Sequence, residues 1–148
     1  MIEERKVAMT TVIAFIAIGL LWFISVLHIY WAFGGRWGTA AVIPVKKGEQ
    51  QPIFKPRKFG TILVAVLILL ASFILIFQAG YLESFQVNTI TNIGSIICAI
   101  VFMIRAIGDF NYLGFFKKIK HSQFARFDTL IYSPLCLYLG FTYIILLF

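Results

Sequence analysis

The sequence predicts an all-α integral membrane protein, a bundle of four transmembrane helices in one domain over residues 1–148. Hydrophobic residues make up 61% of the chain and charged residues 13%, whereas a soluble domain has about 45–50% apolar and about 25% charged residues. The chain also contains four long apolar runs, each near the roughly 20 residues that a helix needs to cross a bilayer. Strands of a β-barrel would be about 10 residues long with alternating polarity, and the runs lack that alternation.

The four predicted spans are residues 7–30, 59–81, 87–107 and 129–148. The first is longer than the apolar region of a signal peptide and follows a mixed charged segment, so we expect it to be a retained helix. The second and third are joined by a short connection, which predicts an antiparallel pair. The fourth contains Pro134, which removes a backbone hydrogen bond and should kink the helix.

The two longer connections differ in character. The first begins with a glycine-rich stretch that should end the first helix, and Pro52 and Pro56 favour irregular structure in its second half. The third mixes aromatic residues with lysines, which predicts an amphipathic helix over residues 109–126 lying in the membrane surface. We expect its lysine side chains to extend toward the lipid headgroups.

Basic residues are distributed unequally between the two ends of the predicted bundle. The first and third connections, with the adjoining helix end, hold six and five Lys or Arg residues, the amino terminus holds two, and the second connection holds none. In a four-span protein the first and third connections share a side, and basic residues in short loops mark the cytoplasmic side. The sequence therefore predicts that both termini lie outside and that loops one and three are cytoplasmic.

The charge also indicates which partners to expect. The formal net charge is +7, and basic residues beside a membrane are attracted to anionic lipid headgroups. We expect no nucleic-acid partner, because that would require a basic face on a soluble domain. The chain lacks H-E-x-x-H, a cysteine tetrad and a carboxylate cluster, so no metal and no cofactor is predicted. Gly94 and Cys98, small and four residues apart, permit close helix contact and leave a homo-oligomer open.

Residues capable of chemistry gather at the predicted cytoplasmic end. They come from three of the four predicted helices: His28, Trp31, Arg105, Asp109, Asp128 and Tyr132. Ionisable groups at membrane depth normally face the bundle interior or a wet cavity, where they pair with one another. The sequence therefore predicts a shared polar pocket just inside the cytoplasmic boundary.

Each charged residue of this pocket has a structural and a functional interpretation. Arg105 and Asp109 are four residues apart, so they can share a helix face and form a salt bridge. Asp128 is expected to cap the start of the fourth helix. His28 is the candidate catalytic residue, because it exchanges a proton near neutral pH, and otherwise it is a hydrogen-bonded packing residue.

Three stretches also carry a resemblance to a known family. They are H-I-Y-W-A-F-G-G from His28, R-A-I-G-D-F-N-Y-L-G-F-F-K from Arg105 and F-A-R-F-D-T-L-I-Y-S-P-L-C-L from Phe124. Their order and spacing resemble a family of small bacterial four-span membrane proteins, the domain of unknown function 3995. The resemblance covers nearly the whole chain, and the stretch from Arg105 to Lys117 is its most specific part. It implies a four-helix fold in the bacterial plasma membrane and no particular activity.

The sequence leaves three functions open. The first is binding or transport of a small amphipathic or anionic ligand, with Arg105 on the anionic group and Asp109 balancing the charge. Trp31 and Tyr132 would then pack against the body of the ligand. The second is an enzyme acting on a lipid-like substrate, with His28 as acid or base beside one of the aspartates. The third is a structural or accessory subunit whose polar residues lock the helices together. The sequence favours a non-enzymatic role.

Overall fold

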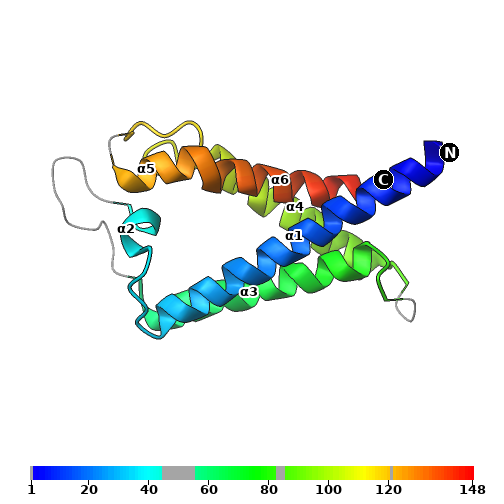
Figure 1. Ribbon diagram of the computed structural model, residues 1–148, viewed down its shortest axis with the longest axis horizontal. Helices are drawn as coiled ribbons and strands as arrows, with labels where there is room; N and C mark the ends of the chain where they lie inside the picture. Colours follow the sequence, from blue (N-terminus) through cyan, green and yellow to red (C-terminus); the bar gives the residue numbers. More distant parts are fainter. Residues whose placement is uncertain (1, 45–55, 83–85, 121) are drawn as a thin grey trace.

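The computed structural model describes residues 2–44, 56–82, 86–120 and 122–148. Over these residues the chain is helical, with no strand (Figure 1); its elements are α1 (Ile2–Ala32), α2 (Thr39–Val42), α3 (Lys58–Gln78), α4 (Thr89–Ile107), α5 (Gln123–Phe127), η1 (Asp128–Tyr132) and α6 (Ser133–Ile145). Four helices are long and apolar enough to cross a membrane: α1, α3, α4 and the continuous helix formed by α5, η1 and α6. The predicted all-helical fold with four candidate spans is confirmed, and it indicates a multi-pass membrane protein.

Local hydrogen bonds define where α4 begins and ends. The Asn88 side chain accepts hydrogen bonds from the backbone N–H groups of Ile90 (2.9 Å) and Thr91 (3.1 Å). The Thr91 hydroxyl accepts one in return from the Asn88 N–H at 3.0 Å. This capping box satisfies N–H groups that have no partner inside the helix. At the other end Gly108 adopts a φ of 93°, which ends α4 in a conformation that suits glycine.

The fourth apolar helix begins at Gln123, earlier than the sequence predicts. Ser122 caps it, because its side chain accepts a hydrogen bond from the Ala125 N–H at 3.0 Å. The prediction that Asp128 caps this helix is therefore wrong, since Asp128 lies inside it. Proline has no backbone N–H, so Pro134 cannot donate the usual helical hydrogen bond. The π-helical turn η1 lies directly before it and widens the helix there, so the helix continues from α5 into α6.

The amphipathic helix predicted over residues 109–126 does not form as such. Residues 108–120 follow bends and turns, and the helical conformation resumes only at Gln123. Gly108 and Gly114 have φ angles of 93° and 81°, which no continuous right-handed helix can include. The mixture of aromatic and basic residues was a misleading signal, because the two glycines decide the backbone path.

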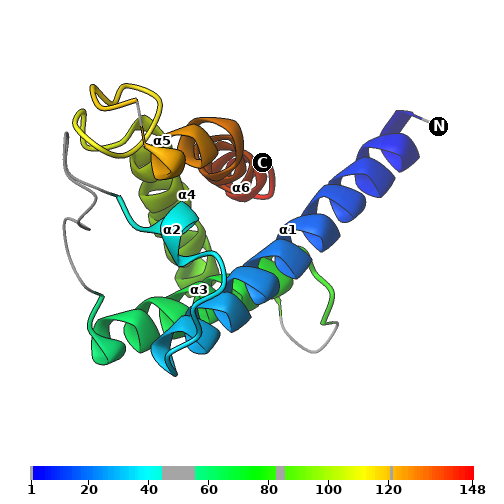
Figure 2. The same cartoon turned by 60° about the vertical axis from the view of Figure 1, so that its left-hand side comes forward.

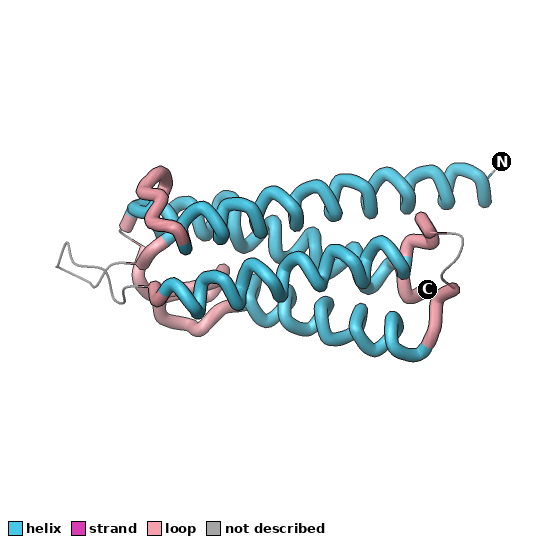
Figure 3. Tube along the Cα trace, turned by 90° about the horizontal axis from the view of Figure 1, so that it is seen from below, coloured by secondary structure: helices cyan, strands magenta, loops and turns pink. Residues whose placement is uncertain are grey.

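The bundle consists of two antiparallel pairs of helices. α1 packs along α3 and α4 packs along α6, and the pairs are joined mainly where α3 meets α4 (Figures 1 and 2). The connections collect at the two ends of the elongated bundle, as the tube in Figure 3 shows. Both termini lie at one end, and α2 and α5 lie at the other (Figure 1). We call the second one the α2 end of the bundle.

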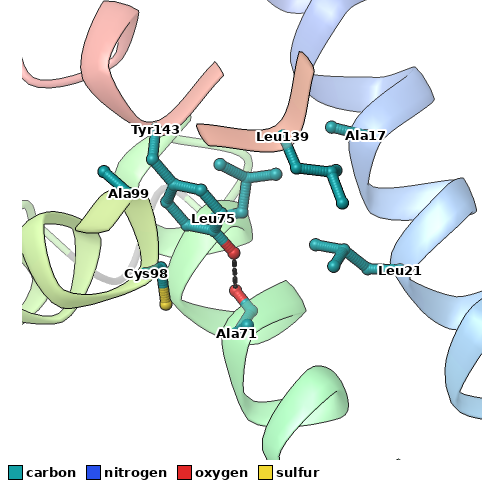
Figure 4. Close-up of a cluster of buried hydrophobic side chains, with 8 residues drawn as sticks. All are labelled: Ala17, Leu21, Ala71, Leu75, Cys98, Ala99, Leu139 and Tyr143. Carbon is teal, nitrogen blue, oxygen red and sulfur yellow. Dashed lines mark hydrogen bonds between the residues drawn. The ribbon is translucent and has the colours of Figure 1, made fainter. Parts of the chain in front are cut away.

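Small residues allow the helices to approach closely at the centre. The core cluster draws on all four long helices and contains Ala17, Leu21, Ala71, Leu75, Cys98, Ala99, Leu139 and Tyr143 (Figure 4). The buried Tyr143 hydroxyl donates a hydrogen bond to the Ala71 carbonyl at 2.6 Å, which ties α6 to α3. A Cβ at Gly140 would lie 3.0 Å from the Met103 side chain, so glycine keeps α6 close to α4. Small residues and interhelical hydrogen bonds are the usual means of packing helices in a membrane.

Candidate functional site

Asp128 is the centre of a buried ion cluster at the α2 end. Its side chain is fully buried on η1 and binds two cations from different parts of the chain. Arg105, in the last turn of α4, donates from Nη2 to Oδ1 at 2.8 Å, and Lys117 donates from Nζ to Oδ2 at 2.9 Å. The Gly114 N–H donates a further hydrogen bond to Oδ2 at 2.8 Å. Both carboxylate oxygens are therefore satisfied, as a buried charge requires.

Lys117 is an internal residue of the connection that leads from α4 to α5. It is only 2% exposed. Lysines are almost never buried to this extent unless an ionic partner compensates the charge, and here Asp128 is that partner. Besides Asp128, its ammonium group donates to the Gly114 carbonyl at 2.9 Å and to the Thr129 hydroxyl at 2.6 Å. All three ammonium protons therefore have acceptors, and the expectation that this side chain extends toward lipid headgroups is wrong.

Two glycines allow the connection to fold back against α4. A Cβ at Gly108 would overlap the Leu113 carbonyl, and a Cβ at Gly114 would overlap the Ile107 carbonyl. The backbone continues with a hydrogen bond from the Phe115 N–H to the Ala106 carbonyl at 2.9 Å. This close approach places the Gly114 N–H and carbonyl beside Asp128 and Lys117, so the glycines help to build the ion cluster.

Asp109 is exposed and binds backbone groups of the connection between α4 and α5 instead of joining the ion cluster. Its Oδ1 accepts hydrogen bonds from the N–H groups of Asn111, Tyr112 and Leu113 at 2.7–2.9 Å. Desolvation opposes ionisation, but the backbone hydrogen bonds outweigh it and hold the pKa of Asp109 below its usual value. The predicted pairing with Arg105 is not found, because α4 ends at Ile107 and Asp109 no longer follows its face.

Tyr132 connects η1 to α2. Its hydroxyl donates to the Ala41 carbonyl at 3.3 Å. Its ring lies 6.2 Å from that of Phe124 and 6.5 Å from that of Phe127, measured between centroids. Aromatic pairs at such distances are favourable contacts, so Tyr132 holds α2 in place next to the ion cluster.

A cavity of about 720 Å³ lies at the same end of the bundle, between α1, α2 and the start of α3. Its wall includes His28 and Trp31 from α1, Thr39 from α2, and Arg57 and Lys58 from the start of α3. Its volume is within the range of about 300–1,000 Å³ that small-molecule sites occupy. The remaining wall is largely apolar, so the cavity combines an apolar body with a few polar groups.

His28 and Trp31 are held in defined orientations in this wall. The Nδ1 atom of His28 lies 2.8 Å from the Ile24 carbonyl. Because a carbonyl can only accept, Nδ1 carries the proton, and Nε2 is the nitrogen left for a ligand. The indole N–H of Trp31 donates to the Trp37 carbonyl at 2.8 Å, and the His28 and Trp31 rings meet edge to face at 5.3 Å.

The charged residues of the cavity wall are cationic. The Lys58 ammonium lies 4.7 Å from the centroid of the Phe33 ring, a cation–π contact that holds it at the rim. Arg57 makes no side-chain hydrogen bond or ion pair with any residue in the described part of the chain. No Asp or Glu of the described residues contributes to the wall. The cavity is therefore suited to an anion.

The structure divides the predicted site residues into two groups. Arg105 and Asp128 meet in the ion cluster with Tyr132 beside it, whereas His28 and Trp31 face the separate cavity. Asp109 belongs to neither group. Whether any of these residues binds a ligand stays a prediction.

Sequence reasoning missed Lys117 in the cluster and the neighbours Arg57 and Lys58 in the cavity. A carboxylate inside an apolar helix such as Asp128 must find cations, which was the available signal for Lys117. For Arg57 and Lys58, Pro56 just before them marks the helix start that brings them to the cavity.

Comparisons with known proteins place the chain in a family. Searches of the curated proteins and of the solved structures found no match. A scan against protein-family models matched residues 21–143 to the family described as "Protein of unknown function (DUF3995)". The matched region contains every residue of the ion cluster and the charged residues of the cavity wall. The match covers most of the sequence and confirms the resemblance of its three stretches, so the chain belongs to the DUF3995 family.

Proposed function

We propose that this protein binds an anionic amphipathic molecule in the cavity between α1, α2 and α3. The observation that carries the proposal is the pairing of an apolar cavity with cations that have no carboxylate partner among the described residues. An unpaired cation beside apolar surface favours an anion that brings its own apolar part. Arg57 and Lys58 would contact the anionic group, and Trp31 would pack against the apolar body.

The α2 end of the bundle is proposed to face the cytoplasm of a bacterial cell. The described cations at that end outnumber those near the amino terminus, Arg5 and Lys6. Positive residues in short connections favour the cytoplasmic side. The cavity and the ion cluster would then lie near the inner leaflet, whose anionic headgroups would be neighbours of the exposed basic residues.

Cysteine labelling tests this orientation. In a variant without Cys98 and Cys136, single cysteines at Lys6 and Lys118 report the two ends. In intact spheroplasts a membrane-impermeant maleimide should label the cysteine at position 6, and it should reach position 118 only after the membrane is opened. Labelling of position 118 in intact spheroplasts would show that the α2 end lies outside.

The ion cluster is proposed to support the cavity rather than to bind the ligand. The three N–H groups of Lys117 and both carboxylate oxygens of Asp128 already have protein partners. Through Tyr132 the same end of the helix holds α2, which forms one wall of the cavity. Arg105 would share this supporting role, since it pairs with Asp128.

A structural or accessory subunit is the second candidate function, and the two ion pairs that Asp128 makes with Arg105 and Lys117 favour it. In that case the cluster locks the helices and the connection together. The enzyme alternative lacks comparable support, because the Nδ1 atom of His28 bonds to a backbone carbonyl and not to an aspartate. A proton-transfer pair of His28 with Asp109 or Asp128 is therefore not assembled in the described structure.

Mass spectrometry of copurifying molecules tests the binding proposal. The test variant is Arg57→Gln with Lys58→Gln, and the matched control is Lys118→Gln with Lys120→Gln, which removes the same charge from exposed positions outside the cavity. The wild-type protein and the control should retain an anionic amphiphile through purification in mild detergent, and the cavity variant should lose most of it. Equal retention by both variants, or no anionic amphiphile in the wild-type protein, would contradict the proposal and favour the structural role.

A further inference from the structure

We propose that the anionic group bound in the cavity is a phosphate monoester and that His28 recognises it by sharing its proton. This inference rests on the proposed function, because it names the headgroup that the same cavity would select. It follows from the fixed tautomer of His28, the cations of α3 and the first turn of that helix.

The tautomer of His28 determines what its free nitrogen can do. With the proton on Nδ1 directed at the Ile24 carbonyl, the neutral ring presents only the lone pair of Nε2 to a ligand. A carboxylate or a phosphate diester offers only acceptor oxygens at neutral pH, so neither can donate to that lone pair. A phosphate monoester loses its second proton with a pKa of about 6, so near that pH a large share of it is singly ionised and still carries a P–OH group. That hydroxyl can donate to Nε2.

Transfer of this one proton strengthens the contact. When the proton moves from the P–OH oxygen to Nε2, the phosphate becomes a dianion and His28 becomes an imidazolium cation. Charge and atoms balance without any other reactant. The resulting hydrogen bond joins two charged partners, and such bonds are about twice as strong as neutral ones.

The start of α3 is suited to the dianion that results. Arg57 and Lys58 supply two positive charges. Together with His28 they are the charged or titratable residues in the described part of the cavity wall, and α2 contributes only the neutral side chains of Thr39 and Val42. The first helical hydrogen bond of α3 is donated by the Thr61 N–H to the Arg57 carbonyl at 3.0 Å.

The N–H groups just before Thr61 therefore have no acceptor inside the 21-residue helix α3. Gly60 is one of these residues, and it lines the cavity with nothing within 4 Å of the position of a Cβ, so a phosphate oxygen can approach its N–H.

The apolar part of the wall favours a lipid over a soluble phosphate ester. Val64, Ile43 and the Trp31 ring line the cavity. Phe33, just after α1, and Phe59 of α3 are sequence neighbours of wall residues and are 73% and 79% exposed. Large exposed apolar side chains at the end of a membrane helix can contact acyl chains. Phosphatidic acid has the required combination of a phosphate monoester and acyl chains.

Lipid-binding measurements on the full-length protein test the proposal. The protein is placed in phosphatidylcholine nanodiscs that contain a minor share of either phosphatidic acid or phosphatidylglycerol, a phosphate diester. Occupancy is read by native mass spectrometry. We expect a preference for phosphatidic acid of about tenfold or more, the size that one charge-assisted hydrogen bond provides. Inorganic phosphate and glycerol 3-phosphate are added in separate samples to test soluble sources.

Two substitutions of His28 separate proton sharing from hydrogen bonding. In His28→Asn the side-chain amide can still donate to the Ile24 carbonyl, but no group replaces Nε2. In His28→Gln the amide lies near the Nε2 position, but it cannot accept a proton. Both variants should lose most of the preference while still binding phosphatidylglycerol. If His28→Gln keeps the full preference, proton sharing is wrong.

Nuclear magnetic resonance of the imidazole groups gives a second readout that needs no substitution of His28. The chain has two histidines, so a His121→Gln background leaves the ¹⁵N signals of His28 alone. Saturating phosphatidic acid should protonate Nε2 at a pH where phosphatidylglycerol leaves it neutral. An unchanged Nε2 signal with bound phosphatidic acid would overturn the inference.

The outcomes distinguish this inference from the proposed function. Equal binding of the two anionic lipids, abolished by Arg57→Gln with Lys58→Gln, would overturn the monoester inference and leave the cavity proposal intact. Binding of neither lipid would overturn both. Tighter binding of glycerol 3-phosphate than of phosphatidic acid would support the monoester chemistry but contradict a lipid source.

Discussion

Replacing Lys117 with methionine removes the ammonium group that ties the connection after α4 to Asp128. Methionine has nearly the same length and is apolar, so it can fill the same buried space. The substitution breaks three hydrogen bonds, to Asp128, to the Gly114 carbonyl and to the Thr129 hydroxyl. Asp128 keeps its bonds to Arg105 and to the Gly114 N–H.

The expected loss of stability follows from what remains buried. Removing one partner of a buried ion pair costs about 3–5 kcal/mol, because the other charge is left without compensation. Arg105 still neutralises Asp128, so we expect the lower end, about 3 kcal/mol. An exposed substitution changes stability by about 0.5 kcal/mol or less. Lys118→Met is the matched control, since Lys118 is the exposed neighbour.

Reversible unfolding in mixed detergent micelles measures the difference, with helicity followed by circular dichroism. A double-mutant cycle with Asp128→Asn isolates the interaction, because that change removes the charge while keeping the shape. The double variant should be more stable than the sum of the single losses predicts. If Lys117→Met is as stable as Lys118→Met, or if the two losses simply add, the ion cluster does not hold this end of the bundle.

Three further predictions concern other contacts. Gly114→Ala should lower the free energy of unfolding by at least about 1 kcal/mol, because its φ of 81° and the nearby Ile107 carbonyl leave no room for a Cβ. The control is Gly19→Ala, where nothing lies within 4 Å of the position of a Cβ. Equal effects of the two substitutions on stability would contradict the described path of the connection. Tyr143→Phe should cost about 1 kcal/mol through the lost bond to Ala71, and a melting temperature equal to that of the wild-type protein would refute this. Asp109→Ala should destabilise at neutral pH. Folding lowers the pKa of Asp109, so its contribution to the free energy of unfolding is fully present above the unfolded pKa of about 4 and is lost as the pH falls through the lower folded pKa. If the difference in stability between the variant and the wild-type protein does not shrink in acid, the carboxylate is not responsible for it.

The helices themselves were predictable because their cause is local. Each apolar run is long enough to cross a bilayer, and a helix satisfies its own backbone hydrogen bonds there without help from distant residues. The same reasoning brought His28, Trp31, Arg105, Asp128 and Tyr132 to one end of the bundle, because the order of the helices determines at which end each residue lies. The length and polarity of the apolar runs therefore predicted the four-helix architecture, and the order of the helices predicted which candidate residues share one end.

The partners of these residues were decided only by the tertiary structure. Arg105 and Lys117 reach Asp128 from 23 and 11 residues away, and two glycines with positive φ direct the backbone that makes the second contact. Arg57 becomes part of a cavity only because α1 and α2 lie opposite the start of α3. Such contacts depend on where a connection crosses the end of a helix, and hydrophobic periodicity carries no information about that crossing.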